Sequence, residues 1–85
     1  MYYLYLLMCA DGTLYTGIAL DVEKRLNEHN TSILGARYTR SRRPVKLIYS
    51  KEVGDQATAS REEYRVKQLS RQGKLALCEG TPAAA

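Results

Sequence analysis

The sequence has no tryptophan, no phenylalanine, one histidine and two cysteines among its 85 residues. One histidine and two cysteines far apart, Cys9 and Cys78, exclude a structural zinc site, which takes four such ligands. No apolar run is long enough to cross a membrane, so no membrane association is expected. The cysteines also lack redox spacing, which predicts reduced thiols in a cytoplasmic protein.

Acidic residues are missing between His29 and Lys51, although the chain has nine of them. That stretch holds six basic residues, four of them arginines within seven positions: Arg37, Arg40, Arg42, Arg43, Lys46 and Lys51. Such a local excess of positive charge suits a phosphate backbone, and the pattern favours this over a merely solvated basic surface. We expect the arginines to contact DNA, with RNA left open, and Tyr38 either to stack on a base or to pack.

The apolar share of 45% and the charged share of 26% predict one globular domain, which we place at residues 1–79. Residues 80–85 have no periodic apolar positions, and we expect a frayed tail there. The apolar start, Met1 to Ala10, lacks the positive charge of a signal peptide and ends at Asp11-Gly12, so it predicts a strand. Nothing in the sequence indicates an interface, and a monomer or a weak dimer is expected.

The apolar patterns predict an α/β (α+β) fold, a small three-stranded antiparallel sheet flanked by helices in the order β-β-α-(α)-β-α. The expected strands are Tyr2–Met8, Thr13–Ala19 and Val45–Val53, the last with Val45, Leu47 and Tyr49 on one side. The first expected helix is Val22–Asn30, capped by Asp21, and a turn or helix is expected in Leu34–Arg40. A long helix is expected from Gln56 or Ala57 to Arg71, stopped by Gly73, and a last short turn or helix in Lys74–Cys78.

Asp11-Gly12 predicts a hairpin, and the length of its loop decides which side chains meet across the strands. A two-residue turn pairs Tyr5 with Ile18 and puts Tyr5 and Tyr15 on opposite faces. A three-residue loop pairs Tyr5 with Gly17 and makes the two tyrosines diagonal neighbours on one face. We favour the second register because a glycine inside a strand marks a close approach, here one that gives the Tyr5 ring room.

Arg25 and His29 lie four residues apart on the first expected helix and therefore on one face of it. Arginine presents a planar fork of donors that matches a phosphate. A lone histidine one turn away, behind two tyrosine-bearing strands, indicates phosphodiester chemistry more than packing. Such chemistry also needs a carboxylate, for which Glu62 and Glu63 are the candidates. The apolar stripe of the long helix lies nearer to Glu62.

Tyr5 in Leu4-Tyr5-Leu6, Tyr15-Thr16-Gly17, and Arg25 with His29 on the next helix resemble the GIY-YIG nuclease family. Three further segments resemble its small stand-alone bacterial members: Gly35–Thr39, Arg43–Val45 and the glutamate helix Ala57–Lys67. The first triplet departs from Gly-Ile-Tyr but keeps the tyrosine. Several family members carry a late active-site asparagine, whereas none follows Asn30 here, so a non-catalytic nucleic-acid-binding module on the same scaffold is the alternative function.

The resemblance implies a metal-dependent nuclease that cleaves DNA phosphodiester bonds, with structure-selective or weakly sequence-specific action suited to repair or recombination. It implies five catalytic residues, namely Tyr5, Tyr15, Arg25, His29 and Glu63. It also implies a structural role for Gly17. Glu63, rather than Glu62, would hold one Mg²⁺ or Mn²⁺ ion. Tyr5, Tyr15 and His29 all remain candidates for the group that activates the water. A tyrosine titrates at about 10, so its pKa must be lowered if it acts as the base.

Overall fold

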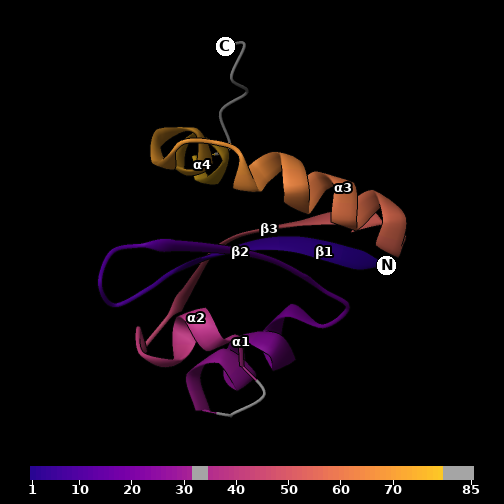
Figure 1. Cartoon of the computed structure of the whole chain (residues 1–85). Helices are drawn as coiled ribbons and strands as arrows, with labels where there is room; N and C mark the ends of the chain where they lie inside the picture. The colour runs from indigo at the N-terminus through magenta and orange to yellow at the C-terminus, as the bar shows by residue number, and fades with distance from the viewer. Residues whose placement is uncertain (32–34, 80–85) are drawn as a thin grey trace.

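The computed structural model describes residues 1–31 and 35–79, which form one sheet with helices on both faces. The elements in chain order are β1 (Tyr2–Met8), β2 (Leu14–Ala19), α1 (Val22–Thr31), α2 (Arg37–Arg40), β3 (Lys46–Gly54), α3 (Gln56–Lys67) and α4 (Arg71–Cys78). Strand β1 lies between β2 and β3, and both pairings are antiparallel. Figure 1 shows α3 and α4 over one face of the sheet, with α1 and α2 under the other. The predicted fold class is confirmed.

The core lies on both faces of β1, because alternate side chains of a strand point to opposite sides. Tyr5 and Leu7 pack on the α1 side, while Leu4 and Leu6 pack against Val66 of α3. A strand that is covered on both faces has no polar alternation, which explains the unbroken apolar sequence of β1. No helix in the described ranges is long and apolar enough to cross a membrane.

The hairpin between β1 and β2 has the predicted three-residue loop. The Cys9 N–H donates to the Thr13 carbonyl at 2.9 Å, and Gly12 has a φ of 84°, in the left-handed region that favours glycine. Tyr5 lies opposite Gly17, so the predicted register is confirmed. This register brings Tyr5 and Tyr15 to the same face of the sheet, the one that α1 covers.

Strand β3 contains an irregularity that the sequence did not predict. Tyr49 lies opposite Leu6 and Leu47 lies opposite Leu7, so the residue between them, Ile48, has no partner in the register. The extra residue puts Leu47 on the face of its partner Leu7 and Tyr49 on the opposite face, that of its partner Leu6. Tyr49 therefore packs on the α3 side and Val45 on the α1 side, and the prediction that they share one side is wrong.

The C-terminal helices also differ from the prediction of one long helix that Gly73 stops. Helix α3 ends at Lys67 and α4 begins at Arg71, so Gly73 lies inside α4. The Ser70 hydroxyl caps α4 by accepting from the Gly73 N–H at 3.1 Å. The predicted turn or helix before the third strand is present as α2. Its start at Leu34, like the tail at 80–85, lies outside the described residues.

Candidate active site

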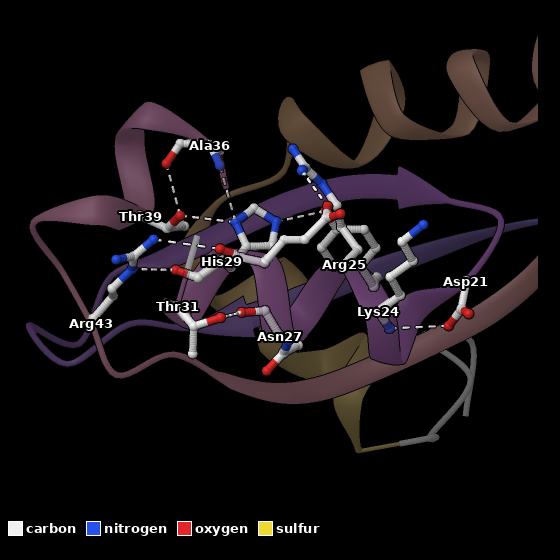
Figure 2. A network of polar contacts seen from close by, with 11 residues as sticks. Asp21, Lys24, Arg25, Asn27, His29, Thr31, Ala36, Thr39 and Arg43 are labelled. Carbon is white, nitrogen blue, oxygen red and sulfur yellow. Dashed lines mark hydrogen bonds and ion pairs between the residues drawn. The ribbon is translucent and has the colours of Figure 1, made fainter. Parts of the chain in front are cut away.

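His29 in the last turn of α1 is completely buried, and both of its ring nitrogens make hydrogen bonds. Nε2 lies 2.9 Å from the Tyr5 hydroxyl oxygen, and Nδ1 lies 2.8 Å from the hydroxyl oxygen of Thr39 on α2. Figure 2 shows Thr39 and Ala36 on one side of the His29 ring and Arg25 on the other. His29 therefore connects the central strand to α2.

The hydrogen bonds of His29 fit both neutral tautomers of its ring. With the proton on Nδ1, His29 donates to the Thr39 hydroxyl, which donates to the Ala36 carbonyl at 2.9 Å, and Nε2 accepts from Tyr5. With the proton on Nε2, His29 donates to the Tyr5 hydroxyl oxygen, and Nδ1 accepts from Thr39 and from the Ala36 N–H at 3.4 Å. In either form, Tyr5, His29 and Thr39 make one continuous hydrogen-bonded chain.

Burial keeps Tyr5 and His29 uncharged near neutral pH. It raises the pKa of Tyr5 to about 12, aided by the nearby Tyr15 and opposed by a hydrogen bond from Arg25. Burial, followed by the positive charge of Arg25, lowers the pKa of His29 to about 4. Tyr5 is therefore a neutral phenol and His29 a neutral imidazole at neutral pH.

Arg25 lies between this buried chain and the surface. Its Nη1 lies 3.0 Å from Glu28 Oε1, and its hydrogen bond to Tyr5 lowers the pKa of that hydroxyl. The Arg25 side chain is 30% exposed, so an incoming phosphate has access to it. Tyr5 and Glu28 hold a guanidinium at the edge of the buried network in an orientation that suits anion binding.

Tyr15 connects the buried pair to α2 through ring contacts. The centre of its ring lies 5.1 Å from that of His29 and 6.4 Å from that of Tyr5. Its ring also stacks on that of Tyr38 at 5.9 Å. Tyr15 is half-buried, and its hydroxyl makes no hydrogen bond to any residue in the described ranges. Of the two candidate tyrosines, Tyr15 is therefore the more accessible from solvent.

Two glycines let the chain approach these side chains closely. A Cβ atom at Gly17 would lie 2.5 Å from the Tyr5 hydroxyl oxygen and 2.6 Å from Cζ of the same ring. A Cβ atom at Gly35 would lie 2.6 Å from the Glu28 carbonyl oxygen and 2.8 Å from Cα of His29. Gly17 thus lets the Tyr5 hydroxyl extend over β2, and Gly35 lets the chain that leads to α2 lie against the end of α1.

Glu63 reaches this region from the helical layer on the other side of the sheet. Its side chain is 25% exposed, pairs with Lys67 at 3.3 Å, and lies near enough for its negative charge to raise the pKa of Tyr5. Glu62 instead pairs with Arg65 at 2.9 Å, and this hydrogen bond lowers the pKa of Glu62. Of the two neighbouring glutamates, Glu63 is the one whose charge acts on Tyr5.

The donor set around Glu63 decides which metal ion fits. Within the described part of the chain, no group of three or more His, Cys, Asp or Glu side chains could enclose a metal. Mg²⁺ keeps several of its waters and needs only one or two protein carboxylates, whereas a structural zinc needs four ligands. The partly exposed pair with Lys67 is worth only about 0.3–0.5 kcal/mol, so an ion can displace it. Glu63 alone thus fits a hydrated Mg²⁺ or Mn²⁺.

The arginines of the basic stretch divide into two groups. Arg37 and Arg40 are exposed and have no partner among the residues described. Arg42 pairs with Asp11 at 3.0 Å and lies 4.0 Å from the centre of the Tyr38 ring. Arg43 donates to the carbonyls of His29 and Glu28 at the end of α1. Contact between these arginines and nucleic acid stays a prediction, and two of them also have structural partners.

Sequence reasoning missed Thr39, Glu28 and Gly35. The spacing of Glu28, three residues after Arg25 on one helix, is a signal for an ion pair and was overlooked. Thr39 lies ten residues from His29 on another element, and no local pattern connects the two. Only its resemblance to the family indicated that the segment from Gly35 to Thr39 contributes to the site.

Comparison with known proteins gives consistent matches over nearly the whole chain. The family described as the GIY-YIG catalytic domain matches residues 1–76. The UPF0213 protein of Desulfotalea psychrophila is 50% identical over 94% of this chain and 73% of its own length. That of Streptococcus agalactiae serotype V is 55% identical over 86% of this chain and 82% of its own length. The solution NMR structure of the UPF0213 protein from Bacillus halodurans is 40% identical, covers 98% of this chain and 88% of its own, and superposes with a TM-score of 0.59.

Proposed function

The chain belongs to the GIY-YIG catalytic domain family, and on that premise we propose that it is a nuclease that hydrolyses DNA phosphodiester bonds with Mg²⁺ or Mn²⁺. One observation carries the proposal. The partly exposed Arg25 is held by a buried chain of Tyr5, His29 and Thr39, and the charge of Glu63 acts on the same Tyr5 from the opposite layer. Hydrolysis of a phosphodiester needs a cationic clamp, a metal ligand and an oriented water close together.

Arg25 binds the scissile phosphate and stabilises the charge that builds up on its oxygens. Tyr5, His29 and Thr39 are positioning residues, because Tyr5 is 2% exposed and the other two are fully buried. Their hydrogen bonds fix the Tyr5 hydroxyl, which in turn orients the guanidinium of Arg25. This arrangement lowers the cost of ordering Arg25 when the substrate binds.

Tyr15 orients the attacking water. Of the three candidates for this role, Tyr5 and His29 are buried, whereas Tyr15 is half-buried and its hydroxyl has no partner in the described residues. A water that donates a hydrogen bond to this hydroxyl lies beside the Tyr5–Arg25 contact, because the Tyr15 ring packs against both Tyr5 and His29. Glu63 would hold the metal ion, which would supply further positive charge at the phosphoryl group.

The test is metal-dependent cleavage of plasmid and branched DNA by the wild-type protein and its variants. Arg25→Ala and Tyr15→Phe each remove one group at the phosphate or the water, and we expect cleavage to fall by about 10²–10³-fold. Lys24→Ala is the matched control, since Lys24 precedes Arg25 and is exposed. Cleavage that survives both active-site changes would overturn the proposal. DNA binding by the wild type without any cleavage would favour a non-catalytic nucleic-acid-binding module.

A further inference from the structure

A pocket of about 260 Å³ lies at the hairpin end of the molecule, outside the residues discussed as catalytic. It is lined by residues from three elements, namely Thr13, Leu14, Tyr38, Arg71 and Lys74. Figure 1 shows the hairpin loop at the end of the sheet that also carries α2 and α4 on its two sides. The pocket is smaller than the ~300–1,000 Å³ typical of sites for drug-sized ligands, and it suits a single phosphate with its sugar.

The pocket lining is cationic and contains no carboxylate. Lys74 is half-buried, and its ammonium group has no hydrogen-bond or ion-pair partner in the described ranges. Arg71 donates to the Gly12 carbonyl, and its other N–H groups have no partner there. The Tyr38 hydroxyl likewise makes no hydrogen bond to a described residue. A cationic lining without a carboxylate, with N–H and O–H donors that have no partner in the described ranges, favours an anionic ligand.

The pocket is continuous with the candidate active site through Tyr38. The Tyr38 ring lines the pocket and stacks on Tyr15, whose own ring lies 5.1 Å from that of His29. A strand that runs from Arg25 along the Tyr15 and Tyr38 rings would bring another of its phosphates to this pocket. A larger hollow of about 430 Å³ lies elsewhere, but its lining includes Asp21 and Glu23 and no cation, so it disfavours phosphate.

The walls of the pocket are tied together before any ligand binds. On the α2 side, Arg42 pairs with Asp11 at 3.0 Å, and the Ala10 N–H donates to the Arg42 carbonyl at 2.9 Å. On the α4 side, Arg71 donates to the Gly12 carbonyl. The two arginines hold the hairpin loop from both faces of the sheet. A site that is already ordered binds its ligand with less entropic cost.

We propose that this pocket is a second phosphate subsite, in which Lys74, Arg71 and the Tyr38 hydroxyl bind a further phosphate of the nucleic-acid strand whose scissile phosphate lies at Arg25. The inference rests on the proposed function, because it takes the substrate to be a nucleic acid. The subsite extends the nucleic-acid-binding surface to α4, whereas the basic stretch of residues 37–43 lies outside that helix. Lys74 and Arg71 are here binding residues and take no part in bond cleavage.

The experiment measures binding of a fluorescein-labelled oligothymidylate of about fifteen nucleotides, at the upper end of site sizes for such strands. Fluorescence anisotropy is recorded in EDTA over a series of salt concentrations, so that cleavage does not interfere. We expect Lys74→Gln to weaken binding about tenfold, the value of one charge-assisted hydrogen bond. The slope of log affinity against log salt should fall by about 0.7, the value of one phosphate contact on a single strand.

Lys24→Gln is the charge-matched control, because Lys24 is exposed on α1 and does not line the pocket. Arg71→Gln and Tyr38→Phe should also weaken binding more than the control does. Arg71→Gln also removes the contact to Gly12, so Lys74→Gln is the deciding variant. Binding and slope in Lys74→Gln equal to those of Lys24→Gln would overturn the subsite.

The subsite and the nuclease proposal fail separately. If the wild type cleaves DNA and Lys74→Gln behaves like its control, only the subsite is wrong. If the wild type binds without cleaving and Lys74→Gln shows the expected loss, the subsite stands and the nuclease proposal falls. In the double variant Arg25→Ala with Lys74→Gln, the two losses should add, because two separate phosphates are involved. Wild-type protein that does not bind the oligonucleotide at any salt concentration overturns the subsite.

Discussion

The role of His29 follows from its contacts with four surrounding residues. Its ring nitrogens bond to Tyr5 and Thr39, Tyr15 packs against its ring, and Arg43 donates to its carbonyl. The spacing from Arg25 predicted the helix face on which His29 lies, but not its depth. Because the side chain is fully buried, His29 would act on the phosphate of the proposed substrate through Tyr5 and Arg25.

The depressed pKa of His29 predicts a specific loss of stability in mild acid. Its pKa is about 4 in the folded protein and about 6.5 in the unfolded chain. Between these values the unfolded chain binds a proton that the folded protein does not, so the free energy of unfolding falls as the pH falls. From pH 6.5 to 4.5 the expected loss is about 2 kcal/mol, measured by urea unfolding at each pH.

A proton NMR titration checks the cause of this loss. His29 is the only histidine, so its imidazole signal needs no assignment. The signal should show no protonation at pH 5.5, and His29→Gln should remove most of the slope between pH 6.5 and 4.5. Carboxyl groups with lowered pKa values, such as Asp11 and Asp55, lose their stabilising effect below that window. A His29 signal that titrates at its ordinary pKa would contradict the prediction.

Gly17→Ala should disrupt the site through a steric clash alone. The new methyl group would lie 2.5 Å from the Tyr5 hydroxyl oxygen, so the ring must move away from His29. We expect a loss of about 1–3 kcal/mol in the free energy of unfolding, together with loss of any DNA cleavage. In a Tyr5→Leu background the same change should cost much less, because the clashing hydroxyl and ring carbon are absent. Equal costs in the two backgrounds would show that Tyr5 is not the cause.

At the scale of elements, local chemistry predicted the starts of α1 and α3 but missed the break between α3 and α4. Asp21 caps α1 as expected, with the Lys24 N–H 3.0 Å from its carboxylate. The break between α3 and α4 was missed because apolar spacing continues through it, from Val66 to Leu69. Only the capping potential of Ser70 marked the new helix, and a serine is a common residue. The register slip at Ile48 has no local signal, because it depends on packing against both layers.

Ser70→Ala tests the role of this break. Removing the hydroxyl leaves the Gly73 N–H without its acceptor, so we expect a loss of about 1 kcal/mol in the free energy of unfolding. Ser60→Ala is the matched control. Ser60 is exposed in the middle of α3, where alanine is the better helix former, and stability should stay the same or rise slightly. Thermal unfolding followed by circular dichroism measures both, and equal melting temperatures would contradict a capping role.

At the scale of the whole molecule, the candidate site draws on both layers of helices. The sequence predicted Tyr5 and Tyr15 on one face, because the loop length fixes their register, and this is what β1 and β2 show. It could not give the position of Glu63, since nothing local relates α3 to a tyrosine on the opposite face of the sheet. The apolar stripe of the helix even favoured Glu62. Such a stripe identifies the side of a helix that packs on the sheet, but it does not show which residue beside the stripe lies near Tyr5.

The two neighbouring glutamates offer a closely matched pair of variants to test this arrangement. Each is partly exposed and pairs with one cation of its own helix, so Glu62→Gln and Glu63→Gln should cost similar, small amounts of stability. They differ in position, because Glu63 acts on Tyr5 and Glu62 pairs with Arg65. We therefore expect Glu63→Gln to lower Mg²⁺-dependent cleavage by about a hundredfold or more, and Glu62→Gln to leave it within about threefold. Titration of Mg²⁺ in the cleavage assay gives the metal affinity of each variant. Loss of cleavage in Glu62→Gln with retention in Glu63→Gln would place the metal ligand on the other flank of α3.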